Sequence, residues 1–425
     1  MRSGCGFRRL VISAVLGFVL LAATPVGQPR LVFLEAEFDG DGGVAGLIGV
    51  SSVAMSPDGK HLYAVSWSDS AVVVFTRDAT SGLLDFVQFH PDGFGGVDGI
   101  DSASSVAVSP DGKHVYIAGT GDDAVAVFSR NATTGGLSFV EAKFDGEGGV
   151  VNGLGGSISV TVSPDGKHVY AAGYDDDAIA VFERNVSTGA LNFVEAKVNG
   201  GGISGLNGAN SVTVSPDGKH VYAAGRLDSA VVVFQRSAVS GTLAFVHAQQ
   251  DGVSGVDGLD EAMEVSVSPD GKHAYSVSSG DDAVAVFSRN VSTGELTFLE
   301  AEFDGEMGVE GLNWANSITV SPDGRSVYTA AVNSRSIAAF SRSRSTGLLE
   351  FCEVKTDGVA GVDGLAGADS VIVSPDGWHV YAAGNFDNAV AAFLVSYFDV
   401  FRADLSEANP TPMPILQAPR AEVGR

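Results

Sequence analysis

The chain has 425 residues, of which 45% are hydrophobic and 18% charged, a composition typical of a soluble globular protein with a large apolar core. Its formal net charge of −26 disfavours nucleic acids and anionic lipid surfaces as partners, because both repel a carboxylate-rich protein. The 55 glycines lack the three-residue period of collagen and therefore indicate many tight turns.

The N-terminal segment has the pattern of a secretion signal. Arginines at positions 2, 8 and 9 are followed by an uncharged, mostly apolar run from Leu10 to Ala23. We therefore predict a signal peptide over residues 1–27 and an extracytoplasmic protein, whether periplasmic, on the cell surface or secreted. An uncleaved anchor is the alternative, because Leu21 stands where a cleavage site prefers a small residue.

The next run, Leu31–Phe38, begins the part of the chain that repeats. It carries a pattern, Leu-x-Phe-Leu-Glu, that elsewhere ends a repeat, although no complete repeat precedes it. The last repeat lacks this pattern, since Ala389–Val395 leads into an unrelated tail. We expect Leu31–Phe38 to be the outer strand of the last repeat, which closes a ring and protects strand edges.

A repeat of about 53 residues occupies the chain from this point onward. The string Ser-Pro-Asp-Gly occurs seven times, starting at Ser56, Ser109, Ser163, Ser215, Ser268, Ser321 and Ser374. Each repeat contains four short runs in which apolar residues alternate with small or polar ones, the period of a β-strand, and turn residues separate the runs. We predict an all-β, seven-bladed β-propeller with four antiparallel strands per blade over residues 31–395.

Residues that recur in every blade are predicted to be structural. A phenylalanine ends each third run, and a tyrosine lies in each second run. Six of the eight histidines share one position beside the Ser-Pro-Asp-Gly turn: His61, His114, His168, His220, His273 and His379. A single active site needs a residue only once, so we assign these residues to the scaffold. Cys352 replaces leucine or valine of other repeats and is predicted to be a buried thiol.

The string Ser-Pro-Asp-Gly-Lys-His-Val-Tyr, followed by Asp-Asp-Ala-Val-Ala-Val-Phe and Thr-Gly-x-Leu-x-Phe, resembles the seven-bladed lactonase-like propellers. That family includes 6-phosphogluconolactonases and relatives of fungal carboxymuconate cyclase, and it is similar to surface-layer proteins with Tyr-Val-Thr-Asn (YVTN) repeats. The resemblance covers nearly all of residues 31–395 and implies the fold. Its shared motifs build blades, so it assigns no catalytic residue to this sequence.

The acidic, glycine-rich loops are predicted to share one face of the ring. Connections from the fourth to the first strand and from the second to the third emerge together, as in Asp251–Asp260 and the Asp281-Asp282 turn. Crowded carboxylates suit Ca²⁺, but the sequence has no known calcium-loop spacing, and Asp-Gly pairs are common in solvated turns. We predict no cofactor, with Ca²⁺ at these loops as the alternative.

Departures from the repeat identify a candidate ligand-binding site, because a site at the axis must break the sevenfold symmetry. In blades four to six they bring five residues toward one sector of the acidic face: Arg226, Glu261, Glu264, Trp314 and Arg335. In an enzyme, arginine would polarise a carbonyl group while Glu264 activates water. The alternative is drift of the repeat at exposed loop tips. No residue is otherwise predicted to be catalytic or to bind a metal.

Two functions remain open. An exported ligand-binding or protein-interaction module fits the near-perfect repetition and the lack of a catalytic motif. The alternative, implied by the resemblance, is a lactonase-type hydrolase that acts on a small carbohydrate-like lactone. We expect a monomer whose partner is a small molecule or a protein, without a membrane span after signal removal. Residues 396–425 should form a flexible tail.

Overall fold

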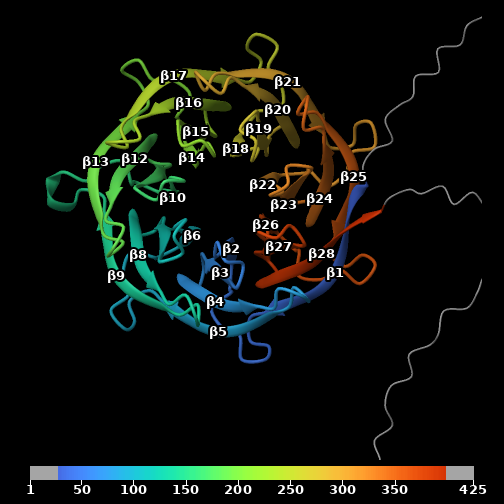
Figure 1. The fold of residues 1–425 in the computed structure, drawn as a ribbon, viewed down its shortest axis with the longest axis horizontal. Helices are drawn as coiled ribbons and strands as arrows, with labels where there is room; N and C mark the ends of the chain where they lie inside the picture. The colour runs from blue at the N-terminus through green and yellow to red at the C-terminus, as the bar shows by residue number, and fades with distance from the viewer. Residues whose placement is uncertain (1–26, 399–425) are drawn as a thin grey trace, which may run out of the picture. The chain divides into compact units, whose positions relative to one another are not determined.

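Seven four-stranded antiparallel sheets surround a central axis in the computed structural model, which describes residues 27–398 (Figure 1). The predicted seven-bladed propeller is confirmed, and its one helical segment in this range is a short 3-10 turn, Glu147–Gly149. The predicted signal peptide, except Gly27, and the tail beyond Phe398 lie outside the described residues. Within those residues, no helix is long and apolar enough to span a membrane.

In six blades the strands follow one another in chain order from the axis to the rim. The strands of blades 1 to 3 are β2 (Val50–Met55), β3 (His61–Ser66), β4 (Ala71–Arg77), β5 (Leu84–Pro91), β6 (Ala103–Val108), β7 (His114–Gly119), β8 (Ala124–Arg130), β9 (Leu137–Phe144), β10 (Ser157–Val162), β11 (His168–Gly173), β12 (Ala178–Arg184) and β13 (Leu191–Val198). The strands of blades 4 to 6 are β14 (Ala209–Val214), β15 (His220–Gly225), β16 (Ala230–Arg236), β17 (Leu243–Gln250), β18 (Ala262–Val267), β19 (His273–Ser278), β20 (Ala283–Arg289), β21 (Leu296–Phe303), β22 (Ala315–Val320), β23 (Ser326–Ala331), β24 (Ser336–Arg342) and β25 (Leu349–Thr356).

Blade 7 combines the two ends of the described chain. Its inner strands are β26 (Ala368–Val373), β27 (His379–Gly384) and β28 (Ala389–Phe398), and the N-terminal β1 (Gln28–Phe38) pairs antiparallel with β28. The predicted closure of the ring is therefore confirmed. The paired strands extend beyond the predicted limits, because Gln28 lies opposite Phe398.

The repeated arginine, tyrosine and histidine side chains join neighbouring blades. Arg130 of blade 2 donates through Nε to the Tyr63 hydroxyl (2.6 Å), and its Nη2 contacts His61 Nδ1 (2.7 Å) and Asp58 Oδ1 (3.2 Å) in blade 1. The Tyr63 hydroxyl donates to the carbonyl of Gly135 (2.9 Å). The same arrangement recurs at six of the seven interfaces between blades, as in the contacts of Arg77 with blade 7. The repeated residues are thus parts of the scaffold.

The interface between blades 6 and 7 is built differently. Ser326 takes the place of the histidine and Val395 that of the arginine, and the Tyr328 hydroxyl is buried without a hydrogen-bond partner among the described residues. An ion pair between Arg30 and Glu353 (3.4 Å) spans this interface instead. The interface between blade 6 and the closing blade therefore lacks the buried arginine network.

Apolar side chains fill each interface between blades, since each core cluster combines residues of two adjacent blades. Cys352 is not part of this core. It is only partly buried, contrary to prediction, because its position in the outer strand faces the surface; Val87 and Leu299, at the same position in other blades, are 37% and 39% exposed.

Candidate functional site

One side chain of each innermost strand forms a ring around the axis. We call these residues the axial ring: Ser52, Ser105, Ser159, Ser211, Glu264, Ser317 and Ser370. Five of the six serines accept a hydrogen bond from a backbone N–H of the next blade, as Ser159 Oγ does from Val212 (3.2 Å). Serine at this position therefore links adjacent blades.

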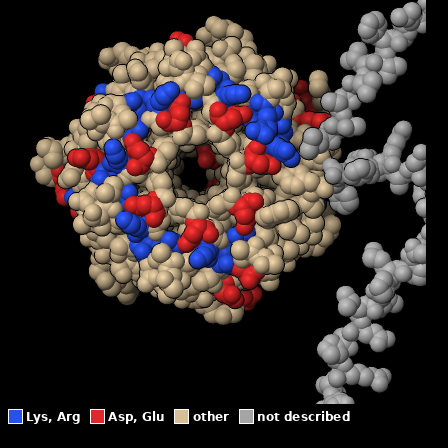
Figure 2. Space-filling model, in the orientation of Figure 1, with Lys and Arg blue, Asp and Glu red and all other residues tan. Residues whose placement is uncertain are grey.

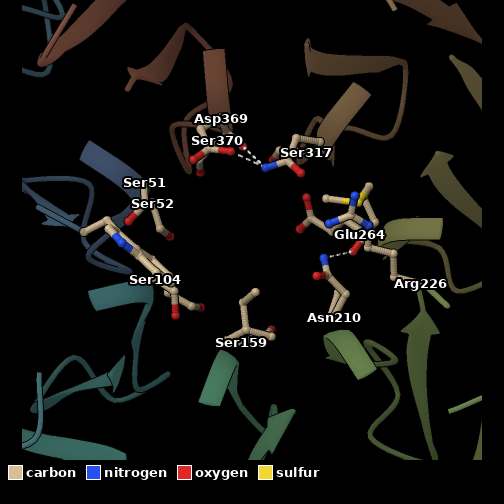
Figure 3. A pocket seen from close by; sticks show the side chains of 16 residues that line it. Ser51, Ser52, Ser104, Ser159, Asn210, Arg226, Glu264, Ser317, Asp369 and Ser370 are labelled. Carbon is tan, nitrogen blue, oxygen red and sulfur yellow. Dashed lines mark hydrogen bonds between the residues drawn. The ribbon is translucent and has the colours of Figure 1, made fainter. Parts of the chain in front are cut away.

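Two cavities meet at the axial ring, and all seven ring residues line both. The first, of about 250 Å³, is also lined by Trp67 and Arg226, which follow the second strands of their blades (Figure 3). It therefore opens on the face predicted to carry the acidic loops, and we call it the axial pocket. The second, of about 380 Å³, extends toward Pro375 in a Ser-Pro-Asp-Gly turn.

Glu264, in β18, is the one carboxylate of the axial ring. Its Oε2 accepts the N–H of Ile318 (2.8 Å), so glutamate makes the same contact between blades that serine makes elsewhere. Burial raises the pKa of Glu264 to about 7, although the hydrogen bonds from Ile318 and Ser317 act in the opposite direction. A carboxyl group in this state exchanges its proton close to neutral pH.

Asp369, in β26, is the second carboxylate of the axial pocket, and it was not among the residues predicted from the sequence. Asn316 Nδ2 donates to a carboxylate oxygen of Asp369 and to its backbone carbonyl (3.1 Å). Burial raises the pKa of Asp369 to about 7, against hydrogen bonds from Asn316 and Asn385. A sequence signal for Asp369 existed, because the position directly before the axial-ring residue differs between blades. Its residues are Ser51, Ser104, Ile158, Asn210, Met263, Asn316 and Asp369.

Arg226 enters the axial pocket from the loop after β15. Its Nη2 and Nε donate to Glu261 Oε2 (2.7 and 3.3 Å), and the Ser279 hydroxyl donates to the same oxygen (2.9 Å). These hydrogen bonds lower the pKa of Glu261, which does not line the pocket but holds Arg226 in place. Nη1 of Arg226 has no hydrogen bond to a described residue and remains available to a ligand.

Trp314 and Arg335 do not line the axial pocket. The backbone N–H of Trp314 donates to Asp282 (2.6 Å), its side chain is 40% exposed, and Arg335 pairs with Asp357. Both residues have positive φ angles, 57° and 52°, in turns outside the strands. The five predicted residues are therefore divided, with Arg226 and Glu264 in the pocket, Glu261 beside it, and two on loops elsewhere.

Three groups of aspartates in the loops are candidates for the predicted Ca²⁺ sites. In each group the carboxylate oxygens lie within 4.8 Å of one another: Asp92, Asp98 and Asp122; Asp251, Asp257 and Asp281; Asp357, Asp363 and Asp387. Burial, with repulsion from neighbouring carboxylates, raises the pKa of one member of each group. Calcium binding stays a prediction, since exposed carboxylates also occur together in solvated turns.

The opposite face, which carries the Ser-Pro-Asp-Gly turns, also surrounds the channel with carboxylates. Figure 2 shows acidic side chains around the opening and basic side chains farther out. In six of the turns the aspartate also pairs with the buried arginine of the next blade, as Asp111 does with Arg184 (2.9 Å). Carboxylates therefore form the inner rim of this opening, and most of them are paired with arginines.

The chain matches the family described as Lactonase, 7-bladed beta-propeller, over residues 49–204, 198–306 and 251–363. The 6-phosphogluconolactonase of Formosa agariphila is 23% identical over 325 residues, which cover 72% of this chain and 85% of that protein. A putative 6-phosphogluconolactonase from Bacteroides uniformis has a similar structure (TM-score 0.58, 24% identity, 72% and 84% of the two chains). So does the periplasmic gluconolactonase PpgL of Pseudomonas aeruginosa (TM-score 0.58, 18% identity, 76% and 87%). The two structural likenesses show the fold.

Proposed function

We propose, from the premise that this chain belongs to the seven-bladed β-propeller lactonase family, that it hydrolyses a small carbohydrate-like lactone in the axial pocket. The observation that carries the proposal is Glu264, a carboxylate at a ring position where six blades have serine, with a pKa of about 7. Such a group is suited to general-base catalysis at neutral pH. A binding module needs no such group, so the hydrolase is favoured over the ligand-binding or interaction function.

In the proposed reaction Glu264 removes a proton from a water molecule, whose oxygen attacks the carbonyl carbon of the lactone. Arg226 donates from its free Nη1 to the carbonyl oxygen, where negative charge develops in the transition state. The bond between the carbonyl carbon and the ring oxygen then breaks and yields a hydroxy acid. Glu261 is a positioning residue, because its ion pair with Arg226 (2.7 Å) fixes the guanidinium group.

The lining of the pocket favours a lactone with uncharged hydroxyl substituents. Serine hydroxyls and the amide of Asn210 offer hydrogen bonds to such groups, and Trp67, 43% exposed, offers an aromatic face. Among the described lining residues Arg226 is the one with a cationic side chain, and Glu261 already pairs with it. A phosphate would face two carboxylates and one cation that is already paired, so we propose an unphosphorylated substrate, unlike that in the names of the 6-phosphogluconolactonases.

The test is a hydrolysis assay of the purified protein on a panel of unphosphorylated and phosphorylated sugar lactones. We expect turnover of an unphosphorylated lactone, a loss in kcat of about 100-fold or more in Glu264→Gln, and a loss of about 100-fold in Arg226→Ala. Glu306→Gln, which changes an exposed loop carboxylate, is the matched control and should be unaffected. The proposal is wrong if no lactone is hydrolysed, or if both site variants keep full activity.

A further inference from the structure

The equivalent positions in other blades show which contacts at position 369 the fold requires. In blade 5 the same position is Met263, and Asn210 Nδ2 donates to its backbone carbonyl (2.8 Å). Asn316 Nδ2 makes the equivalent bond to the backbone carbonyl of Asp369 (3.1 Å). The link between the blades therefore uses the backbone, and it forms equally well to a residue with an apolar side chain.

The carboxyl group of Asp369 is thus dispensable for the scaffold and is expensive to bury. A buried carboxylate lowers stability unless a cation compensates it, and the contacts of Asp369 among the described residues are with the amides of Asn316 and Asn385. The same holds for Glu264, since serine satisfies its ring position in the other blades. Two such groups in one small cavity indicate a shared chemical role.

Their placement suits the two ends of a lactone. Glu264 and Asp369 come from blades 5 and 7 and line the same cavity of about 250 Å³, with Ser317 of blade 6 between them (Figure 3). The guanidinium group of Arg226 comes from blade 4 and reaches blade 5, where it pairs with Glu261 and lines the pocket with Glu264. A lactone whose carbonyl oxygen contacts Arg226 places its carbonyl carbon near Glu264 and directs its ring oxygen toward Asp369.

We infer, on the premise of the proposed function, that Asp369 is the general acid that protonates the ring oxygen as its bond to the carbonyl carbon breaks. One proton of the water passes to Glu264 while the water oxygen bonds to the carbonyl carbon. The electron pair of the broken bond stays on the ring oxygen, which takes the proton of Asp369. The products are the hydroxy acid, protonated Glu264 and ionised Asp369, and proton exchange with water in the channel restores both side chains.

The ionisation of both groups agrees with these roles. Burial raises the pKa of each to about 7, so near neutral pH each group is present in both forms. An acid and a base in one pocket predict a bell-shaped dependence of kcat/KM on pH.

The test compares an aliphatic lactone with the thiolactone of the same ring, whose leaving thiolate needs no proton. We expect Asp369→Asn to lower kcat/KM on the lactone by about 100-fold, to change it only a few-fold on the thiolactone, and to remove the alkaline limb of the pH profile. Glu264→Gln should lower kcat/KM equally on the lactone and the thiolactone, and it should remove the acidic limb of the pH profile. Asp369→Ser restores the residue of blades 1 and 2, and it should fold and behave as Asp369→Asn does.

The two proposals fail separately. If the wild-type protein hydrolyses no lactone, the proposed function is wrong. If the wild-type protein is active but both Asp369 variants lose the lactone and the thiolactone equally, or keep the alkaline limb of the lactone profile, Asp369 is not the acid. The pH profile on the lactone alone decides the question should the thiolactone not be turned over.

Discussion

Replacing Glu264 with serine should change the free energy of unfolding, relative to the wild type, more favourably at alkaline pH than at acidic pH. The substitution restores the residue of the other six blades, so the serine hydroxyl can accept the Ile318 N–H as its counterparts do. The folded state holds the Glu264 proton up to a pKa of about 7, whereas the unfolded chain releases it near the ordinary value of 4.5. The folded state therefore binds more protons between these values, and its stability falls as the pH rises from 4.5 to about 7.

The size of the effect follows from the same shift. At about 1.4 kcal/mol for each tenfold change in proton affinity, a rise in the pKa from 4.5 to about 7 means that the ionised carboxylate costs at most about 3.5 kcal/mol above pH 7. Glu264 is only partly buried, so screening by solvent reduces this cost to roughly 1–3 kcal/mol. The serine variant lacks this dependence.

Equilibrium urea unfolding of the wild type and Glu264→Ser at pH 5 and pH 8 measures the difference. The free energy of unfolding of the variant, relative to the wild type, should be larger at pH 8 than at pH 5 by roughly 1–3 kcal/mol. Glu306→Ser, on an exposed loop, is the control and should show no such change. A variant whose relative stability is the same at both pH values would refute the buried, proton-holding state of Glu264.

Three further predictions concern the scaffold, the loops and the N-terminus. Arg130→Met should lower the free energy of unfolding by about 3–5 kcal/mol, because it leaves Asp58, His61 and Tyr63 without their arginine partner. Arg30→Met removes a partly exposed ion pair and should cost less than about 1 kcal/mol. Chemical denaturation of both variants measures the difference. The calcium alternative predicts that millimolar Ca²⁺ raises the melting temperature and that a chelator reverses this, with Asp98→Asn reducing the effect; an unchanged midpoint would leave the aspartate groups as solvated turns. Export predicts that the intact mass of the protein recovered outside the cytoplasm lacks residues 1–27, and a full-length mass would contradict this prediction.

The sequence predicted the fold well because the pattern of one blade occurs seven times in it. Each blade repeats the same turns and strand periods, and the position of Leu31–Phe38 relative to the repeat was enough to identify the closing strand. The repeated histidines could be assigned to the scaffold by the same logic, but their partner Arg130 and its equivalents were not recognised, because a contact between blades joins residues about 70 positions apart.

The candidate site was predicted only in part. Glu264 was found because serine fills its position in every other blade, so one exception was conspicuous. Asp369 was missed because no single residue type is the rule at its position, so an exception is not conspicuous, and only the folded chain shows that this position faces the pocket. Trp314 and Arg335 were grouped with the site because they break the repeat, but the placement of a residue in a turn depends on local contacts. Here these are the hydrogen bond from the Trp314 backbone N–H to Asp282 and the ion pair of Arg335 with Asp357.

The way the ring is completed has a consequence for synthesis on the ribosome. Arg30 and Ser396, which hydrogen-bond across the closing strand pair, are 366 positions apart. During synthesis β1 therefore cannot pair until β28 has been made. Six blades can assemble from strands that are neighbours in the chain, while β1 stays without a partner and exposes its backbone groups to other chains. A nascent or truncated chain that ends before β28 therefore presents an open strand edge, and such chains should be the ones that aggregate or require a chaperone.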